Sequence, residues 1–509
     1  MRPGRREYIA LALVALLVAG FVAASVPEPA YTDAYYYFNA GRRLADGLGL
    51  TDPYIALTYL GAPETLPGPS HTYWMPLTSL LVALAGGSFA GTQVILAAMW
   101  VALAVLAFWL GAFLGGSRRH AWAAGLLTLF CGFYVPYLTT TDTFTPFGLF
   151  GALSLLAMGL GRARGDWRGF ALAGALAGLA HLTRADGILL AGVLVIAAGW
   201  PWQGRWGSHR LGLVGAGLAA YLLVMIPWFV RNLQVIGAPL PTAGTATIWL
   251  RGYNEIVSYP PTALAANFLA WGWGNILASR WEAFLNNLGT FIAVEGWVML
   301  GPLLVIALAR RWRDPLLLPV WLYALLLHAL MTVVFAYPGY RGGLFHSAAA
   351  LIPWWALLGI MGLDDVVDWV AARRRHWKPA RARGVFTAGV VVMAVALTAL
   401  VSRGRLGGSD AAGPLFRVAR EMLPEDAVVM SNDPAAMYYH TGRAGVVVPD
   451  AGPQAIRALA AQYGVTHVLL DENHTQPLVP LYEGREIPAF LRPVPQDVAP
   501  SVRVFEVLR

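Results

Sequence analysis

The sequence is poor in charged residues. Only 13% of its 509 residues are charged, against about a quarter in ordinary soluble domains, whereas 57% are hydrophobic. Cysteine is far scarcer, because Cys131 is the only one, which excludes an internal disulfide framework and a cysteine-clustered metal site. Lysine occurs once, at Lys378, among 36 basic residues, so the preference for arginine suggests a codon bias rather than selection for phosphate binding. A single water-soluble globule is therefore excluded.

Repeated apolar runs close to twenty residues long, with a mean hydropathy of +0.56, indicate a multi-span membrane protein instead. Several of the runs are shorter than a full crossing. If all of them cross, the chain has eleven transmembrane helices. The predicted spans are residues 8–26, 92–114, 121–138, 147–160, 169–182, 188–200, 211–230, 288–309, 315–336, 347–363 and 385–401.

Arginine placement gives the expected topology. Arg2, Arg5 and Arg6 precede the first span, which lacks a clear cleavage site, so the N-terminus is expected in the cytoplasm. The segment 76–85 is laid in the membrane interface, because at 1.5 Å per residue it spans only about 15 Å. The arginine-rich connectors then share the cytoplasmic side, which predicts a multi-pass protein of the bacterial inner membrane. These connectors are residues 118–119, 162–168, 205–210, 310–313 and 373–383.

The expected organisation has two domains. Residues 1–401 form the transmembrane domain, with external loops at 27–73 and 231–287, and residues 402–509 form a small extracytoplasmic α/β domain. The tail has no phosphate loop and no dinucleotide fingerprint. No basic run exceeds three residues, so the net charge of +8 reflects topology and no nucleic-acid partner is expected. The predicted strands are 427–430, 445–448, 466–470 and 502–507, and the predicted helices are 434–439 and 453–463.

The first external loop opens with a predicted amphipathic helix over residues 31–47 that carries Asp33 and Tyr36. Asp33 either caps this helix, or acts just outside the first span as a general base or a metal ligand. His71 lies between prolines before the interfacial segment, where an exposed structural histidine is an equally open interpretation.

Four further charged residues follow predicted spans. Asp142 either caps a helix or lines a site. Arg184 and Asp186 lie between two apolar helices with almost no loop, so they either pair with each other or face a shared cavity and bind an anion. Arg231 either anchors a helix in the interface or contacts substrate.

The segment 337–347 places Arg341 and His346 on the external side beside several glycines. Both side chains donate hydrogen bonds that a phosphate would accept, so this segment is the best candidate for a phosphate site. The chemistry-bearing residues thus gather on the external face, where no nucleotide is available. A donor activated as a lipid-linked phosphate fits a site at bilayer depth, and membrane lipids are expected neighbours.

The order of these elements resembles the GT-C superfamily of membrane glycosyltransferases, and within it the protein O-mannosyltransferases and the aminoarabinose transferases. The resemblance rests on Asp33 and the following tyrosines, the Pro/His element at His71, Asp142 after the third span, and the turn at 182–187. It covers roughly residues 1–360. The chain departs from the family at Thr72-Tyr73, where prolines are usual, and at Ala34, where many relatives have a second acid.

The resemblance implies an α-helical polytopic fold and an inverting transfer of a sugar from a polyprenyl-phosphate donor to an acceptor glycan, lipid or protein. Asp33 would activate the acceptor, directly as a base or by holding a divalent metal, for which Asp33 and His71 are the candidate ligands. The donor phosphate would be bound by Arg341, Arg184, His346 and Arg231, and the sugar by Asp142, Asp186, His71 and Tyr36.

Two other classes of protein fit part of the pattern. A transporter or lipid flippase would also have many spans and scattered charge, although no internal repeat is visible and the ionisable residues gather on one face. A polysaccharide polymerase or ligase would also act on the external face and use a lipid-linked substrate. The sugar, the acceptor and the need for a metal stay open at the level of sequence.

Overall fold

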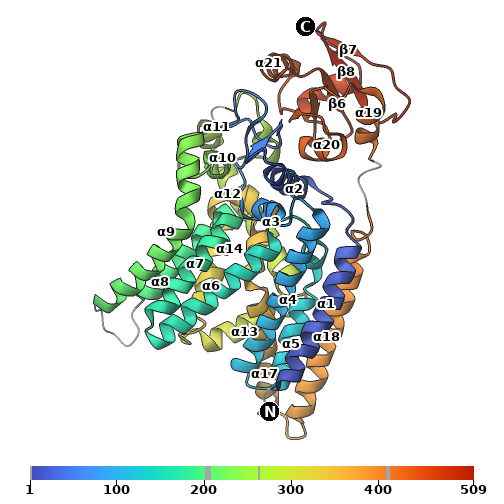
Figure 1. The fold of residues 1–509 in the computed structure, drawn as a ribbon. Coiled ribbons are helices and arrows are strands. Elements are labelled where there is room, and N and C mark those ends of the chain that lie inside the picture. The colour runs from blue at the N-terminus through green and yellow to red at the C-terminus, as the bar shows by residue number, and fades with distance from the viewer. Residues whose placement is uncertain (1–2, 201–207, 262–263, 409–412, 509) are drawn as a thin grey trace. The chain divides into compact units, whose positions relative to one another are not determined.

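The computed structural model describes residues 3–200, 208–261, 264–408 and 413–508 (Figure 1). Arg2 and Arg205, which belong to two of the predicted cytoplasmic arginine groups, lie outside the described residues. The chain divides into two compact units: unit 1 is residues 1–26, 93–230 and 280–407, and unit 2 is residues 27–92, 231–279 and 408–509. Unit 2 therefore combines the C-terminal segment with loop segments that the sequence analysis had placed with residues 1–401.

The protein is mostly helical, and six helices among the described residues are long and apolar enough to cross a membrane. This agrees with an integral membrane protein that has several apolar spans. The number of crossings and their direction remain predictions. The six are Arg5–Ala24 (α1), Phe89–Phe113 (α4), Phe144–Arg164 (α6), Arg210–Ile236 within α9 (Ser208–Ile236), Ala336–Ala371, which ends with α17 (Ile352–Ala371), and Pro379–Ser402 (α18).

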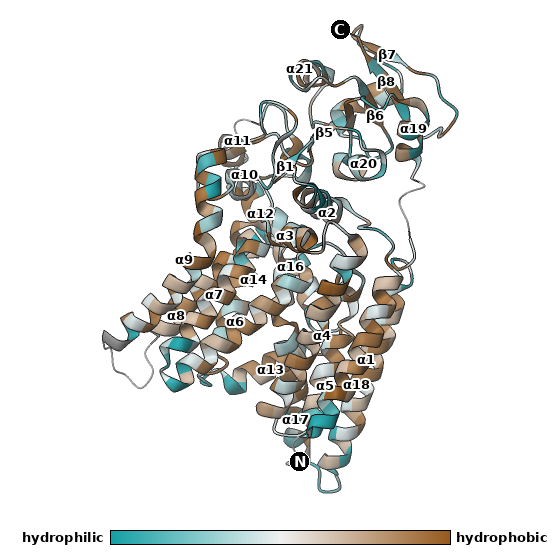
Figure 2. Ribbon diagram, in the orientation of Figure 1, coloured by the Kyte–Doolittle hydropathy of each residue, from teal (hydrophilic) through white to brown (hydrophobic). Residues whose placement is uncertain are grey.

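Helices α1 and α18 show why a membrane is needed. Figure 2 colours both largely as hydrophobic, yet only 22% of the apolar window of each is buried within the protein. Leu17 is 75% exposed on α1 and Leu400 is 67% exposed on α18. Such apolar surface is compatible with lipid and would be costly in water.

Close helix packing in unit 1 relies on small residues. A Cβ atom on Gly174 of α7 (Trp167–Thr183) would lie 1.9 Å from the carbonyl oxygen of Gly217 on α9, so only glycine fits there. Small residues at such crossings let helix backbones approach each other in a membrane. The remaining elements of unit 1 before residue 290 are α5 (Arg118–Leu129), the 3-10 turn Gly132–Tyr137, the 3-10 turn Ala185–Gly187, α8 (Ile188–Gly199) and most of α12 (Trp273–Thr290).

The predicted span at 288–309 is not one helix, and this expectation is corrected. Helix α12 begins 15 residues earlier, at Trp273, and passes into the π-helical segment Phe291–Glu295, after which the chain breaks before α13 (Gly301–Arg311). The break contains two non-glycine residues with positive φ, Trp297 at 46° and Val298 at 68°. Pro302 in the first turn of α13 then favours a new helix start over continuation of the old one.

The later helices of unit 1 are also interrupted. Helix α14 ends in a π-helical segment, and a second π-helical segment around Gly342 precedes two short helical turns. Such irregular turns in apolar helices often occur at functional sites. These elements are α14 (Leu318–Ala329), Leu330–Val334, α15 (Ala336–Pro338), Gly339–Gly343, α16 (Leu344–Ser347) and the 3-10 turn Ala348–Leu351.

Unit 2 is built around a six-stranded sheet of order β2-β5-β4-β6-β8-β7. The first four strands in this order are parallel, and β8 and β7 pair antiparallel at one edge. Four strands match the predicted segments; β2 and β7 were not predicted, and β2 comes from the segment 27–73, which was predicted to be an external loop. The strands are β2 (Tyr54–Ile55), β4 (Val429–Ser431), β5 (Gly445–Val447), β6 (His467–Leu470), β7 (Leu491–Pro493) and β8 (Arg503–Val507).

The helices of unit 2 include the amphipathic helix expected in the first external loop and a short helix within the segment 76–85, which was expected in the membrane interface. A two-stranded pair, β1 (Thr51–Asp52) with β3 (Gly68–Pro69), lies between them in the chain. An independent domain at 402–509 stays a prediction, because the sheet also contains β2. The helices are α2 (Thr32–Ala45), α3 (Leu77–Leu84), α10 (Thr242–Ala246), α11 (Leu264–Ala270), α19 (Pro414–Met422), α20 (Pro434–Thr441), α21 (Pro453–Tyr463) and α22 (Val479–Tyr482), with 3-10 turns at Thr247–Trp249, Tyr253–Val257 and Gln476–Leu478.

Candidate active site

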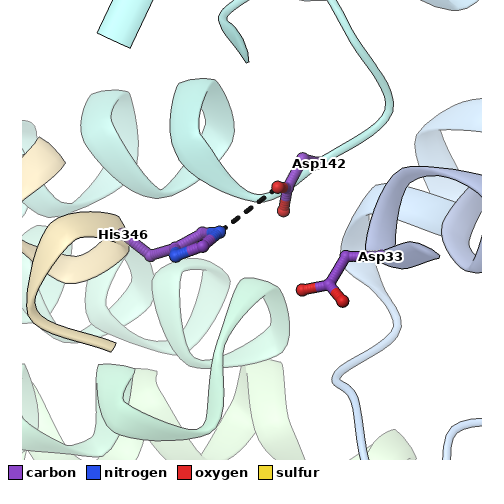
Figure 3. A group of neighbouring side chains, drawn as sticks. All are labelled: Asp33, Asp142 and His346. Atoms are coloured by element: carbon purple, nitrogen blue, oxygen red, sulfur yellow. Dashed lines mark hydrogen bonds and ion pairs between the residues drawn. The ribbon is translucent and has the colours of Figure 1, made fainter. Parts of the chain in front are cut away.

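The polar cluster of unit 1 is centred on Asp142 and His346 (Figure 3). Asp142 lies just before α6 and is 1% exposed, and His346 lies in α16. The two residues are 204 positions apart in the chain, yet His346 Nε2 is 3.2 Å from Asp142 Oδ2. The imidazole also stacks on Phe144, with ring centroids 4.0 Å apart. The stacking and the contact with Asp142 together fix the orientation of the ring.

The partners of His346 define what its two nitrogens can do. Nδ1 lies 2.9 Å from the carbonyl oxygen of Gly342, which can only accept, so Nδ1 carries a hydrogen. Gly342 has φ at 147°, a conformation that favours glycine. Nε2 faces the Asp142 carboxylate, which is also an acceptor when ionised. The arrangement is therefore satisfied by a proton on Nε2, or by a cation held between Nε2 and Oδ2.

Arg184 lies at the end of α7 and forms an ion pair with Asp186, with Nε 3.2 Å from Oδ1. The guanidinium also donates to the hydroxyl of Ser347 at 3.2 Å and contacts that of Thr143 at 3.4 Å. The Ser347 hydroxyl in turn donates to Asp186. The side chains of Arg184 and Asp186 are only 19% and 11% exposed, so the pair is largely desolvated. This agrees with the interpretation in which the two charges pair across the turn.

The two groups of contacts form one network in unit 1. Thr143 directly follows Asp142 and Ser347 directly follows His346, so the same two chain segments supply both groups. Sequence analysis named the four charged members but missed Thr143 and Ser347, because an uncharged hydroxyl carries no pattern that distinguishes it from a helix cap. The network holds a guanidinium and an imidazole in fixed positions, which are groups that can bind a phosphate.

Arg341 lies in the π-helical turn Gly339–Gly343, one residue before Gly342, and its side chain is exposed. The carbonyl oxygen of Gly342 is the one that contacts His346. Arg341 therefore lies on the segment that supports the cluster of unit 1, and its position remains compatible with the predicted phosphate contact.

Asp33 lies in unit 2, in the first turn of α2, and is half-buried. The N-cap residue of α2 is Tyr31, so the interpretation of Asp33 as the helix cap is not supported. A carboxylate in the first turn of a helix is favoured by the helix dipole. Asn39 on the same helix is buried at 3% exposure, so not every polar residue of the helix is open to solvent.

His71 is fully buried in unit 2 and has φ at 59°. Its Nδ1 lies 2.7 Å from the Ser70 hydroxyl and its Nε2 3.0 Å from the Ser79 hydroxyl. Burial, and secondly the charge of Arg231, lower the pKa of His71 to about 3. The imidazole is thus neutral, and a metal ion would have to displace one of the two hydroxyls.

Tyr36 and Asp52 lie beside this histidine. The Tyr36 hydroxyl accepts a hydrogen bond from the His71 amide at 2.6 Å and is also bonded to Asp52. Burial raises the pKa of Asp52 to about 7, although Tyr36, Arg43 and Arg231 oppose the shift. Asp52 Oδ1 has no hydrogen-bond partner within the described part of the chain. Sequence analysis missed Asp52, because a single acid next to Pro53 is typical of a turn.

Arg231 also belongs to unit 2 and supports the same loop. Its guanidinium donates to the carbonyl oxygen of Ser70 at 2.7 Å and to Asn232 Oδ1 at 3.0 Å. An open cavity of about 680 Å³ lies beside it. The guanidinium of Arg231 therefore borders a cavity whose walls are formed mainly by apolar residues and prolines. Its lining is Leu50, Thr51, Pro67, Gly68, Pro69, Arg231 and Val235.

Comparison with solved structures identifies the fold. The chain is similar to the archaeal oligosaccharyltransferase AglB from Archaeoglobus fulgidus in complex with an inhibitory peptide and a dolichol-phosphate, with a TM-score of 0.56 and 13% identity over 91% of this chain and 69% of that one. Another structure of that archaeal enzyme, a complex with zinc and sulfate, has a TM-score of 0.54 at 14% identity, covering 91% and 68% of the two chains.

Two bacterial enzymes are similar as well. ArnT from Cupriavidus metallidurans bound to undecaprenyl phosphate matches with a TM-score of 0.55 and 16% identity over 99% of this chain and 98% of that one. The arabinofuranosyltransferase AftD from Mycobacteria matches with a TM-score of 0.52 and 15% identity over 100% of this chain and 40% of that one. No protein-family model and no curated protein matches the chain at the level of sequence.

These similarities confirm the predicted resemblance at the level of fold: the chain has the fold of the GT-C glycosyltransferases. The match to ArnT extends over nearly the full length of both chains, so it includes unit 2 as well as the membrane helices. At this level of identity the comparison concerns architecture.

Proposed function

We propose that the protein is a membrane glycosyltransferase that moves a sugar from a polyprenyl-phosphate donor to an acceptor on the external face of the bacterial inner membrane. The observation that carries the proposal is the desolvated network of Arg184, His346 and Asp142 in a chain with the GT-C fold. Two similar structures are complexes with a dolichol-phosphate and with undecaprenyl phosphate, which supports a lipid-linked donor.

The reaction needs little acid assistance, because a phosphate is already a good leaving group. The acceptor oxygen or nitrogen attacks the anomeric carbon, the bond from that carbon to the phosphate oxygen breaks, and polyprenyl phosphate leaves with the electron pair. Arg184, Arg341, Arg231 and His346 would stabilise its charge, and fixed donors in a partly desolvated site are effective in that role. Because the reaction is a single displacement, it inverts the configuration at the anomeric carbon.

Asp33 is assigned the activation of the acceptor. Its carboxylate would take the proton that the acceptor hydroxyl or amine loses as the new bond forms. The half-buried position in the first turn of α2 supports this role, since the group is held by a helix and reachable. Asp142 and Asp186 are assigned to the sugar hydroxyls and to orienting the basic groups. His71 and Tyr36 are buried in unit 2, so a sugar contact from either would require the loop to open.

A divalent cation is compatible with the pair of unit 1. Asp142 Oδ2 and His346 Nε2 are 3.2 Å apart and would both be ligands, with His346 Nδ1 held by the Gly342 carbonyl as an outer contact. When bound, such an ion would supply positive charge near a leaving phosphate. The structure of the archaeal enzyme with zinc and sulfate is consistent with a divalent cation at this pair. An acceptor peptide or glycan would then bind at a site that already carries positive charge.

The test is transfer of label by purified protein in vesicles. Polyprenyl-phosphate mannose and polyprenyl-phosphate aminoarabinose, each labelled in the sugar, are supplied separately with a cell-envelope extract as acceptor. Asp33→Asn should abolish transfer and leave membrane insertion intact. Asp46→Asn is the matched control, because Asp46 is an exposed acid at the other end of the same helix. Near-normal turnover by Asp33→Asn would remove Asp33 from the mechanism.

The same assay separates the rival functions. A transporter or flippase would move the labelled lipid across the vesicle without forming a new glycosidic bond. A polysaccharide polymerase would give products that grow in length. A ligase would transfer a whole labelled chain in one step. A single added sugar on the acceptor is the outcome that the proposal requires.

A further inference from the structure

The first external loop contributes a strand to the sheet of the C-terminal segment. Strand β2 pairs in parallel with β5, with Tyr54 opposite Gly445 and Ile55 opposite Val446. A Cβ atom on Gly445 would lie 2.1 Å from the carbonyl oxygen of Val429, so only glycine allows β5 to lie this close to β4. The two parts of the chain, almost 400 residues apart, therefore share one continuous sheet.

Helix α2 of the same loop packs on the C-terminal segment through buried side chains. Tyr35, Tyr36 and Tyr37 belong to one apolar cluster with residues of α19, α20 and β4. Asn39 Nδ2 donates to the carbonyl oxygen of Ala435 at 2.8 Å within this buried contact. A buried amide that lost its partner would cost free energy, so this bond fixes the register of α2 against α20.

The first turn of α2 is held by a side chain of the C-terminal segment. The Thr32 hydroxyl donates to Asp433 Oδ2 at 2.6 Å. Asp433 is itself the N-cap of α20, because its Oδ1 accepts from the Ala436 amide at 3.0 Å. The Tyr35 hydroxyl lies 3.1 Å from His440 Nε2 at the end of the same short helix. One carboxylate thus joins the starts of two helices.

From these contacts we infer that the C-terminal segment positions the acceptor-activating carboxylate, with Asp433 acting through Thr32 as the positioning residue for Asp33. The inference rests on the proposed function of Asp33, the next residue after Thr32 in the same turn. A shift of the first turn of α2 would move the Asp33 carboxylate directly. Displacements of about 1 Å in a reacting group are enough to cost roughly a hundredfold in rate.

The experiment compares three threonine variants in the transfer assay with labelled polyprenyl-phosphate sugar. Thr32→Val keeps the shape of the side chain but removes the hydroxyl, and Asp433 can still cap α20. Thr32→Ser keeps the hydroxyl. Thr475→Val is the matched control, since it removes a threonine hydroxyl that donates to the Pro449 carbonyl at 2.9 Å in the same unit.

Thr32→Val should lower kcat roughly tenfold with little change in the KM for donor. Thr32→Ser should restore most of the rate, and Thr475→Val should leave kcat close to wild type. The double variant Thr32→Val with Asp433→Ala should be no slower than Asp433→Ala alone, because both changes remove the same bond. A general loss of folding would instead lower the active fraction in Thr32→Val and Thr475→Val alike.

Two results would overturn the inference, and they are distinguishable. If Thr32→Val keeps wild-type kcat while Asp33→Asn is inactive, Asp33 acts on the acceptor but Asp433 does not position it. If Asp33→Asn itself keeps its turnover, the proposed function of Asp33 fails and there is no catalytic group for Asp433 to position.

Discussion

Unit 1 and unit 2 each enclose a histidine, but surround it with different partners. His346 in unit 1 lies between a carboxylate and a carbonyl oxygen, both of which are acceptors. His71 in unit 2 lies between two serine hydroxyls, is fully buried, and has its pKa lowered to about 3 by burial. The same side chain thus has different surroundings in the two units: His346 lies between two acceptors, whereas the neutral ring of His71 lies between two hydroxyls.

Under the proposed function, the two units have separate tasks. Unit 1 would supply Arg184, Arg341 and His346 for the phosphate, and unit 2 would supply Arg231 together with Asp33 on a helix fixed by the C-terminal segment. A substitution at a functional residue of one unit should therefore impair the task of that unit and leave the other task unchanged.

Among substitutions in unit 1, the largest effect is expected from Arg184→Gln. It leaves Asp186 as a mostly buried charge without its ion-pair partner, and it removes the donor that the proposed function assigns to the leaving phosphate. Transfer should fall by about 10² to 10³ and binding of polyprenyl phosphate should weaken. Arg118→Gln is the control, because it removes an ion pair with Glu7 in which the arginine is 55% exposed, and transfer should hardly change. Equal losses in the two variants would show that charge at Arg184 has no special role.

A smaller effect is expected from Asp142→Asn, which changes the partner of His346 without changing its size. If a cation is held there, affinity for Mn²⁺ measured by calorimetry should fall roughly 10- to 100-fold, and chelation should lower the transfer rate of the wild type. If wild type and Asp142→Asn bind Mn²⁺ equally and chelation has no effect, Asp142 and His346 act through the hydrogen bond between them and do not bind a metal ion.

The smallest effect concerns stability and is confined to unit 2. The pKa of His71 is lowered in the folded state to about 3, from 6.5, so the stability that its burial contributes is lost as the pH falls from 6.5. The pKa of Asp52 is raised to about 7, from 3.8, so its contribution is lost as the pH rises towards 7. The two dependences oppose each other between pH 4 and 6.5.

Each group would change the free energy of unfolding by about 1.4 kcal/mol per pH unit in that window. His71→Gln should therefore become more stable relative to wild type as the pH falls from 6.5 to 4, and Asp52→Asn less stable, as measured by thermal unfolding in detergent. Parallel stability curves for all three proteins would contradict the assigned environments.

Several elements were predictable because their signals are local. Helix α21 has the predicted bounds, since Pro453 favours a helix start and Gly464 adopts the left-handed conformation that ends one. The Arg184–Asp186 turn could be found because two charges between apolar helices are costly unless they pair or act. Helix α2 was found from its position after the first span and its amphipathic pattern.

Other features depend on contacts between distant segments and carry no local signal. Strand β2 has two residues, and only its pairing with β5 makes it a strand. Thr32 and Asp433 are ordinary residues in helix-start positions, and their bond spans 401 positions. The break at 296–300 interrupts a run in which Glu295 is the one charged residue, so hydropathy alone predicts a single span there.

The most direct test of the division of tasks is equilibrium binding of polyprenyl phosphate to wild type, Asp33→Asn and Arg341→Gln, measured beside their transfer rates. Arg341 is exposed, so its substitution should not disturb the fold. Asp33→Asn should bind the lipid within about twofold of wild type and transfer no sugar, whereas Arg341→Gln should lose affinity, since it removes a charged hydrogen-bond donor. Weakened lipid binding by Asp33→Asn, with full affinity in Arg341→Gln, would contradict the account.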